Sequence, residues 1–132
     1  MSDFRLSFTA SADDIDELGH VNNARWVAWL ERLSVAHWEA LTDAATQARW
    51  FWVIRRHELD YRGNIGAGAT AEGVTWVDPA GPNGATWDRL ARFTADERTL
   101  VEARTTWAVI DRERGRPVRV PAELVALFGR AP

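Results

Sequence analysis

Apolar residues between positions 23 and 41 recur at steps of three and four, a spacing that places them on one face of an α-helix. The residues on this face are Trp26, Trp29, Leu30, Leu33, His37, Ala40 and Leu41. The remaining helix surface is largely apolar too, with Val27, Ala28, Val35 and Trp38. Such a helix needs burial on most sides, which a strongly curved sheet wrapped around it would supply.

Elsewhere the chain alternates between apolar and polar residues, the pattern of half-buried strands. Glycine and proline residues mark the turns between them. The polar segment 42–49 extends the long helix or turns away from it, and Pro121 is expected at the first turn of a final helix over 122–128. Strands are predicted at 4–9, 51–62, 69–77, 85–94 and 100–110, and the pattern allows a short pairing at 118–120.

The predicted order is one strand, one long helix and then four or more strands, which indicates an α+β fold. Short connections between consecutive strands favour an antiparallel meander that curls round the helix. A chain of 132 residues, without repeats, low-complexity tracts or linkers, is expected to form a single domain over residues 1–132.

Composition narrows the range of partners and chemistry. A net charge of −3 argues against a nucleic-acid binder, and the absence of cysteine excludes disulfides and thiolate nucleophiles. The three histidines form no recognisable metal motif, so neither a metal nor another cofactor is expected. With no signal peptide and no apolar run long enough for a membrane span, we expect a cytoplasmic protein. Eight tryptophans and five phenylalanines in so short a chain indicate that a second copy covers some of them, in a homodimer or homotetramer.

Candidate chemistry lies where a charged loop, residues 12–21, meets the helix start. Asn22 is a good helix N-cap because its side chain can accept from the free N–H groups of the first turn, and Val21 would then pack on Trp26. Asp16 lies six positions earlier (22 − 16), near enough for the loop to fold its carboxylate over the helix N-terminus. The carboxylate could activate a water molecule, and the free N–H groups could stabilise the oxyanion that forms on a carbonyl. The alternative is a loop carboxylate attracted only to the helix dipole.

The string DIDELGHVNN at 14–23 resembles the signature of hot-dog-fold thioesterases of the 4-hydroxybenzoyl-CoA thioesterase type and of related acyl-carrier-protein thioesterases. The match continues with Trp26, Trp29 and Glu31, and more weakly over 59–61, 75–77 and 111–121, so it covers nearly the whole chain. The resemblance implies a hot-dog fold, a long central helix wrapped by a curved antiparallel sheet of five or more strands. It also implies an enzyme that hydrolyses an acyl-CoA or acyl-carrier-protein thioester to a free acid and a thiol.

Two positions depart from that signature. Trp26 stands where the family usually has tyrosine, so a hydrogen bond from the phenol is lost or is replaced by one from the indole N–H. Leu18 stands where the plant carrier-protein enzymes have a catalytic asparagine, which favours a CoA substrate over a carrier protein.

The resemblance implies roles for five residues of the loop and helix start. Asp16 matches the catalytic carboxylate, as nucleophile or general base, and the Asn23 backbone N–H matches the donor to the thioester carbonyl. His20 is expected to orient the substrate or exchange a proton, or else to pack beside the asparagines. Asn22 and Trp26 are expected to contact substrate, with the acyl group in a tryptophan-lined slot beside the helix and the site between subunits.

Coenzyme A carries several phosphate charges, so arginines should gather at the mouth of the site. The densest group is Arg112, Arg114, Arg116 and Arg119, followed by Arg89 and Arg92. The alternative for each of these arginines is a solvated position on a turn.

Two rival functions stay open at this point. A hot-dog hydratase or dehydratase would use His20 with an acid to move a proton, although residues 19–23 read GHVNN and lack the proline and glycine of the usual dehydratase pattern. A non-catalytic protein would bind the acyl thioester without turnover. Glu31 is a further candidate acid whose ordinary role would be an ion pair with Arg32 or Arg55, while His37 and His57 lack a suitably spaced carboxylate and are expected to be structural.

Overall fold

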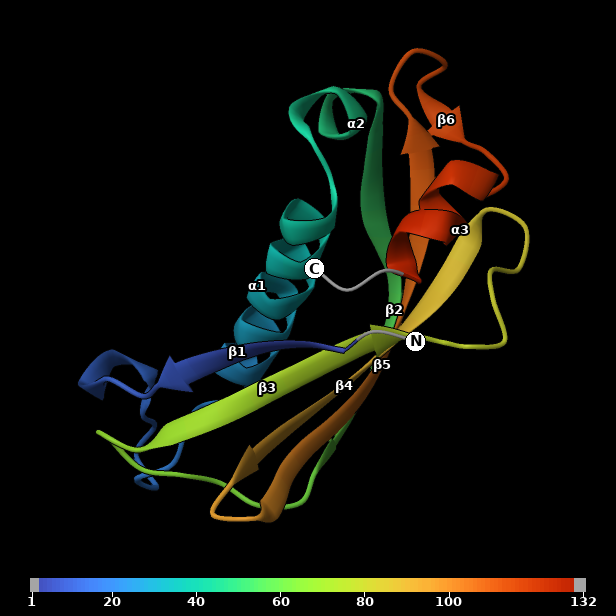
Figure 1. Ribbon diagram of the computed structural model, residues 1–132. Helices are drawn as coiled ribbons and strands as arrows, with labels where there is room; N and C mark the ends of the chain where they lie inside the picture. Colours follow the sequence, from blue (N-terminus) through green and yellow to red (C-terminus); the bar gives the residue numbers. More distant parts are fainter. Residues whose placement is uncertain (1–2, 130–132) are drawn as a thin grey trace.

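The computed structural model describes residues 3–129 and contains a long helix and a curled antiparallel sheet of six strands (Figure 1). The ends of the expected domain, 1–2 and 130–132, lie outside the described residues. The strands are β1 (Phe4–Thr9), β2 (Trp50–Tyr61), β3 (Thr70–Val77), β4 (Thr86–Ala95), β5 (Arg98–Asp111) and β6 (Arg116–Pro117). The helices are the 3-10 turn η1 (Ala12–Asp14), α1 (Asn23–Leu41), α2 (Ala44–Arg49) and α3 (Ala122–Phe128).

The sheet confirms the α+β class and the predicted strands, but its strand order differs from a simple meander. The order is β1-β3-β4-β5-β2, with β6 paired to β5, and every pair is antiparallel. Only β3, β4 and β5 follow one another as expected. The connection 62–69 carries the chain from β2 at one edge to β3 beside β1, and Arg62 and Gly63 tie its start to the carbonyl of Leu100. The short pairing forms at Arg116–Pro117 rather than at 118–120.

Both ends of helix α1 follow from local sequence. Asn22 is the N-cap, and its side chain accepts from the Ala24 N–H at 2.8 Å, as predicted. Beyond Leu41 the chain turns away, and Asp43 caps the separate short helix α2 through the N–H of Thr46. Pro121 is the N-cap of α3 and therefore lies one position before the first turn in which it was predicted. Within residues 3–129, no helix has the length and apolarity needed to cross a membrane.

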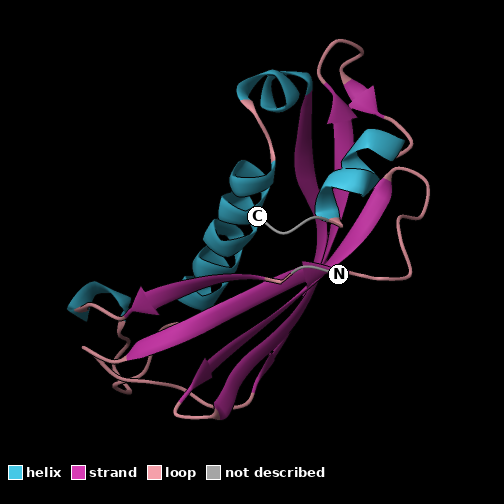
Figure 2. Cartoon of the chain, viewed as in Figure 1, coloured by secondary structure: helices cyan, strands magenta, loops and turns pink. Residues whose placement is uncertain are grey.

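Helix α1 is buried along one face, whereas the sequence pattern predicts burial on most sides. The buried residues are Trp26, Trp29, Leu30, Leu33, Ser34 and His37. Val35 is 45% exposed, and Ala40 is exposed at the end of the predicted apolar face. The sheet bends around α1 on the side of β1 and β3 and leaves the opposite side of the helix open (Figure 2).

Gly73 on β3 sets the distance between α1 and the sheet. A Cβ atom added at this position would lie 2.9 Å from Phe93 Cε1, 3.0 Å from Leu33 Cδ2 and 3.3 Å from Phe8 Cε2. These three side chains belong to the main core cluster, which joins the first half of α1 to the sheet. Only a residue without a side chain fits between them.

The second half of α1 meets the sheet through a buried polar pair. The Arg89 Nη1 of β4 donates to Nδ1 of His37 at 2.8 Å and to Oγ1 of Thr75 at 3.2 Å. Burial, and secondarily the Arg89 charge, lower the pKa of His37 from 6.5 to about 3, so the imidazole is neutral at pH 7. The predicted structural role of His37 agrees with this position.

Replacing Gly73 with alanine should destabilise the fold by about 1–3 kcal/mol, because the added methyl group overpacks the contact between Leu33 and Phe93. Urea unfolding measures the change. Gly66→Ala is the matched control, since its Cβ would meet only the Gly19 carbonyl at an ordinary 3.5 Å. Equal losses of stability in the two variants would contradict the close approach at Gly73.

The His37 pair predicts a pH dependence of stability. Between the folded pKa of about 3 and the unfolded value of 6.5, the unfolded chain binds more protons, so the free energy of unfolding falls as the pH is lowered through this window. Wild type should lose up to about 1.4 kcal/mol per pH unit more than His37→Asn, which cannot titrate. Urea midpoints measured from pH 7.5 to pH 4.5 test this. Parallel curves for the two proteins would show that His37 is protonated in the folded state.

Candidate active site

The predicted catalytic loop folds into a tight, closed turn between η1 and α1. Ile15 pairs with Val21 in an isolated antiparallel bridge, and the Asp16 N–H donates to the His20 carbonyl at 2.9 Å. Gly19 closes the turn with a φ of +79°, a conformation that favours glycine, and its N–H donates to the Asp16 carbonyl at 3.0 Å. The loop therefore presents residues 16–20 as one compact unit (Figure 1).

The Asp16 carboxylate is held by its own loop. Its Oδ1 accepts from the N–H groups of Leu18 at 2.9 Å and His20 at 3.3 Å. Among the described residues no hydrogen bond joins this carboxylate to the first turn of α1, where the sequence placed it, and its Oδ2 has no partner. The side chain is half-buried. One oxygen is therefore fixed in place while the other is available to a water molecule or a substrate.

The neighbouring Asp14 has a structural role. Its carboxylate accepts from the Ser11 N–H at 2.9 Å and lies 3.5 Å from Nε of Arg25 in the first turn of α1. Its backbone carbonyl accepts from the Asn22 N–H at 2.9 Å. Asp14 therefore ties η1 to the helix start on one side of the loop.

Asn64 supplies a second tie that the sequence analysis missed. Its side chain brackets the backbone of Val21, accepting from the N–H at 3.0 Å and donating to the carbonyl at 3.2 Å. The only signal in the sequence was an asparagine between Gly63 and Gly66, which indicates a turn and no more. Asn64 holds Val21, the last residue before the N-cap, in a fixed position relative to the sheet.

The helix start offers one backbone donor. Asn22 uses its side chain as the N-cap, and its carbonyl accepts from the N–H groups of Arg25 and Trp26. No hydrogen bond within the described part of the chain engages the Asn23 N–H, which points out of the positive end of the helix dipole. The Asn23 carbonyl accepts from the Tyr61 hydroxyl at 3.4 Å. Asn23 can therefore offer its N–H to the oxygen of a ligand.

His20 and Leu18 form the exposed tip of the loop. His20 is exposed and Leu18 is 75% exposed. Among residues 3–129 the His20 imidazole has neither a hydrogen bond nor a carboxylate partner. Its side chain is free to meet a ligand from outside this chain.

Trp26 lies in the core of this chain. It is fully buried, and its ring packs edge-on against Trp29 at 5.1 Å and Phe93 at 5.3 Å between centroids. Its indole Nε1 is buried without a partner among the described residues. The fourth residue of the helix faces the sheet because the N-cap fixes the rotation of the first turn. The contacts that the structure shows for Trp26 are therefore core contacts.

The arginine group lies far from the loop. Arg112 and Arg114 lie in the turn from β5 to β6 and Arg116 begins β6, at the opposite end of the molecule from the turn at residues 16–20 (Figure 1). All three are exposed; the Arg112 guanidinium lies over the Phe51 ring at 4.5 Å, and Nε of Arg114 lies 3.6 Å from Oδ2 of Asp111. One copy of the chain does not bring these arginines to Asp16.

Away from the loop, a histidine lies close to a carboxylate, a contact that the sequence did not reveal. His57 on β2 has Nε2 3.8 Å from Oε1 of Glu31 and Nδ1 2.9 Å from Oγ1 of Thr105. The partner of Glu31 is thus His57, rather than the expected Arg32 or Arg55. Register between strand and helix brings together residues that are 26 positions apart (57 − 31).

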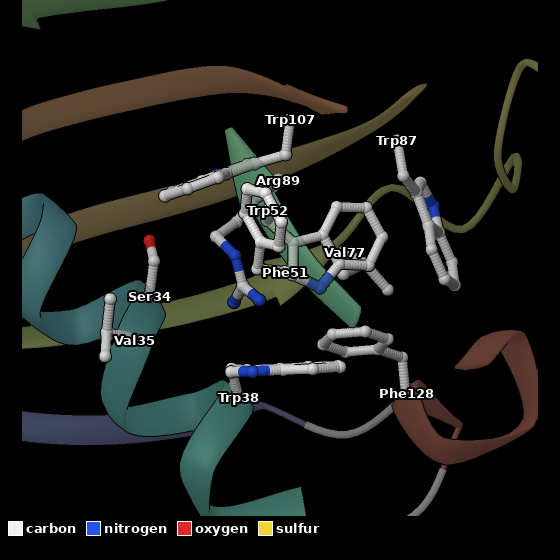
Figure 3. Close-up of a pocket in the computed structure, with 10 residues that line it drawn as sticks. All are labelled: Ser34, Val35, Trp38, Phe51, Trp52, Val77, Trp87, Arg89, Trp107 and Phe128. Carbon is white, nitrogen blue, oxygen red and sulfur yellow. The ribbon is translucent and has the colours of Figure 1, made fainter. Parts of the chain in front are cut away.

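A pocket of about 210 Å³ opens beside the second half of α1, where the chain was expected to have a tryptophan-lined slot. Helix α1 contributes Trp38, helix α3 contributes Phe128, and the sheet contributes the remaining rings (Figure 3). The aromatic lining consists of Trp38, Phe51, Trp52, Trp87, Trp107 and Phe128. No group of three or more histidine, aspartate or glutamate side chains in the described chain could hold a metal ion.

Comparison with solved structures finds thioesterases of the same fold. A predicted thioesterase from Bacillus stearothermophilus is 20% identical with a TM-score of 0.85, over 97% of this chain and 95% of that one. A thioesterase from Thermus thermophilus, complexed with coenzyme A and Zn, is 22% identical with a TM-score of 0.81, over 96% and 94%. A 1,4-dihydroxy-2-naphthoyl-CoA thioesterase from Synechocystis is 10% identical with a TM-score of 0.80, over 97% and 96%.

These likenesses establish the hot-dog fold. None of the curated proteins matches the sequence at a significant level. The model of the thioesterase-like superfamily matches residues 10–128, which include the loop, all of α1 and almost the whole sheet. The chain therefore belongs to the thioesterase-like superfamily.

Proposed function

We propose that this protein hydrolyses acyl-CoA thioesters, with Asp16 as general base or nucleophile and the Asn23 N–H as oxyanion donor. Two features of the same loop–helix junction carry the proposal. Two loop amides hold the Asp16 carboxylate, and the first N–H of helix α1, that of Asn23, has no partner within the described chain. Membership of the thioesterase-like superfamily supports the reaction class.

The loop geometry supports a defined role for each group. The amides of Leu18 and His20 hold Oδ1 of Asp16, so the carboxylate keeps one orientation without help from the substrate. As general base, its free oxygen takes a proton from water while the water oxygen attacks the carbonyl carbon. The negative charge that forms on the carbonyl oxygen is stabilised by the Asn23 N–H and the positive end of the helix dipole. Collapse of the intermediate breaks the carbon–sulfur bond, and the thiolate leaves and takes up the proton.

Asn64 positions these groups relative to one another. By holding both backbone polar groups of Val21, it fixes the junction through which the loop enters the helix. A shift of about 1 Å between carboxylate and oxyanion donor is enough to cost about 100-fold in rate. Asn64 is therefore a positioning residue in this proposal.

The likeness to CoA-dependent neighbours supports CoA over a carrier protein. The Thermus thermophilus protein was crystallised with coenzyme A, and the Synechocystis enzyme acts on a naphthoyl-CoA. We assign Arg112, Arg114 and Arg116 to the CoA phosphates. Because one copy keeps them at the end opposite Asp16, this assignment requires that a second copy supplies them.

A homodimer or homotetramer would also account for the exposed apolar side chains. Val35 on α1 is 45% exposed, and Val53 and Tyr61 on β2 are 37% and 45% exposed. Strand β2 is an edge strand, and its outer edge pairs with no strand of the described chain. Such an edge is a site for pairing with another chain. In this proposal, Asn22 and Trp26 influence substrate binding indirectly, because they hold the helix start in place. The assembled enzyme works in the cytoplasm.

Hydrolysis is better supported than a hydratase or dehydratase that works through His20. That reaction needs a histidine and an acid acting together on neighbouring carbons. The His20 imidazole has no carboxylate partner in the described chain, and the histidine that has one is His57, on β2.

Replacing Asp16 with asparagine should lower kcat about 10²- to 10⁴-fold, because the general base is lost while the amide oxygen can still accept from Leu18 and His20. Free-thiol release from a panel of aliphatic and aromatic acyl-CoAs measures the effect. Asp13→Asn is the matched control, since Asp13 is an exposed carboxylate of the same loop. Full activity in Asp16→Asn would move the reaction centre to Glu31 and His57. If wild type binds acyl-CoAs and hydrates enoyl-CoA but releases no thiol, the hydratase reaction would be established instead.

Replacing Arg112, Arg114 and Arg116 together with glutamine should raise KM for acyl-CoA and leave turnover of the matching N-acetylcysteamine thioester, which has no phosphates, unchanged. A mixture of this triple variant with Asp16→Asn tests the shared site. If one copy supplies Asp16 and the other the arginines, refolding the two variants together should give more activity at low acyl-CoA concentration than the two variants measured separately. Activity that stays at the level of the separate variants would place the arginines outside the site.

A further inference from the structure

The aromatic pocket holds a buried positive charge with no counterion among the described residues. Arg89 reaches into it from β4 and is only 6% exposed (Figure 3). Its recorded partners are neutral, the Nδ1 of His37 and the hydroxyl of Thr75, and no carboxylate of the described residues forms an ion pair with it. Burial lowers the pKa of Arg89 to about 9, so the guanidinium is charged at pH 7. A buried charge without a counterion lowers the free energy of unfolding, so its presence requires an explanation.

The same pocket carries further hydrogen-bond donors that have no acceptor. Trp52 and Trp107 both line it, and the indole N–H of each is buried without a partner among residues 3–129. Buried polar groups are normally paired. Both indole nitrogens are covered by neighbouring atoms, so the charged donor that a ligand in the pocket can reach is the Arg89 guanidinium, and the ligand must bring acceptors to it.

The size and shape of the pocket favour a flat ligand. An apolar cavity of roughly 150 Å³ is enough to hold benzene, and this pocket measures about 210 Å³. Trp38 and Phe128 lie nearly parallel on one side, with an interplanar angle of 21°. The space therefore suits one aromatic ring with a small substituent.

We infer that this pocket binds a planar aromatic carboxylate, with the carboxylate on the Arg89 guanidinium and the ring among the tryptophans. Two sources share this chemistry. One is an acyl group that carries a second carboxylate, in which case the inference rests on the proposed hydrolase activity. The other is a free aromatic acid, such as the product of hydrolysis, which binds whether or not the protein is a hydrolase.

The position of the pocket separates it from the thioester carbonyl of the same chain. Ser34, which lines the pocket, is 11 residues beyond Asn23 (34 − 23) and so lies about 17 Å further along α1. Within one chain this distance is too long for a benzoyl-sized acyl group, so the pocket of a single chain would hold a separate acid. A second copy would have to place its own helix start nearby for the pocket to meet the reacting carbonyl.

Benzoate, with benzamide as its neutral analogue, tests the inference through tryptophan fluorescence and calorimetry. Wild type should bind benzoate saturably and benzamide at least about tenfold more weakly, since charge-assisted hydrogen bonds to Arg89 are lost. Arg89→Met should bind the two alike and weakly. Arg92→Met is the matched control on the same strand, because the Arg92 side chain is 47% exposed, and it should bind benzoate as wild type does. Equal binding of benzoate to wild type and Arg89→Met would overturn the inference.

Thermal unfolding gives an independent readout. Arg89→Met removes a buried charge but also leaves Nδ1 of His37 without its donor, so the readout is the effect of ligand: benzoate should raise the Tm of wild type and not that of Arg89→Met. A strongly destabilised Arg89→Met whose Tm still rises with benzoate would show that Arg89 is structural and would overturn the inference.

Thioester substrates distinguish the two sources. Thiol release is compared for benzoyl-CoA and 4-carboxybenzoyl-CoA with wild type and Arg89→Met. A selective loss of kcat/KM for the carboxylated thioester in the variant would assign the pocket to the acyl group. Equal effects on both thioesters, with benzoate binding lost, would assign it to a free acid. If no thioester is hydrolysed and benzoate still binds through Arg89, the proposed function fails and the pocket inference stands.

Discussion

The close contact between helix α1 and strand β3 at Gly73 determines where the other parts of the molecule lie. Because no side chain separates them there, Leu33 of the helix meets Phe8 and Phe93 of the sheet directly. This contact sets the height of the helix above the sheet. It thereby sets the position of the helix start at one end and of the pocket beside the helix at the other.

The two halves of α1 perform different tasks. The first half is packed into the main core, and its start is held by Asn22, Asn64 and the loop that carries Asp16. The second half, from Ser34 to Trp38, meets the sheet through the buried pair of His37 and Arg89 and borders the aromatic pocket. Three of the four buried side-chain nitrogens without a partner in the described chain, those of His37, Trp52 and Trp107, lie on this side, and the fourth is the indole nitrogen of Trp26 near the helix start.

Much of the chain's bulky apolar surface finds no cover within one copy. The outer side of α1 and the edge strand β2 stay open, and the arginines proposed for CoA lie at the end of the molecule opposite Asp16. The proposed function would account for these features with an assembly that brings the loop of one copy to the arginines of another. The single chain would then contain every part of the proposed site without bringing the parts together.

The sequence by itself determined the features that depend on neighbouring residues. These are the N-cap at Asn22, the buried face of α1, the main strands and the motif at 14–23, because caps and periodicity act over a few positions. The tertiary structure alone decided which residues meet across the sheet. Strand order overrode the simple meander, Trp26 turned into the core while Trp52 and Trp107 line the pocket, and Arg89 met His37 across 52 positions (89 − 37). Such pairings depend on strand register and helix placement, which no short stretch of sequence specifies.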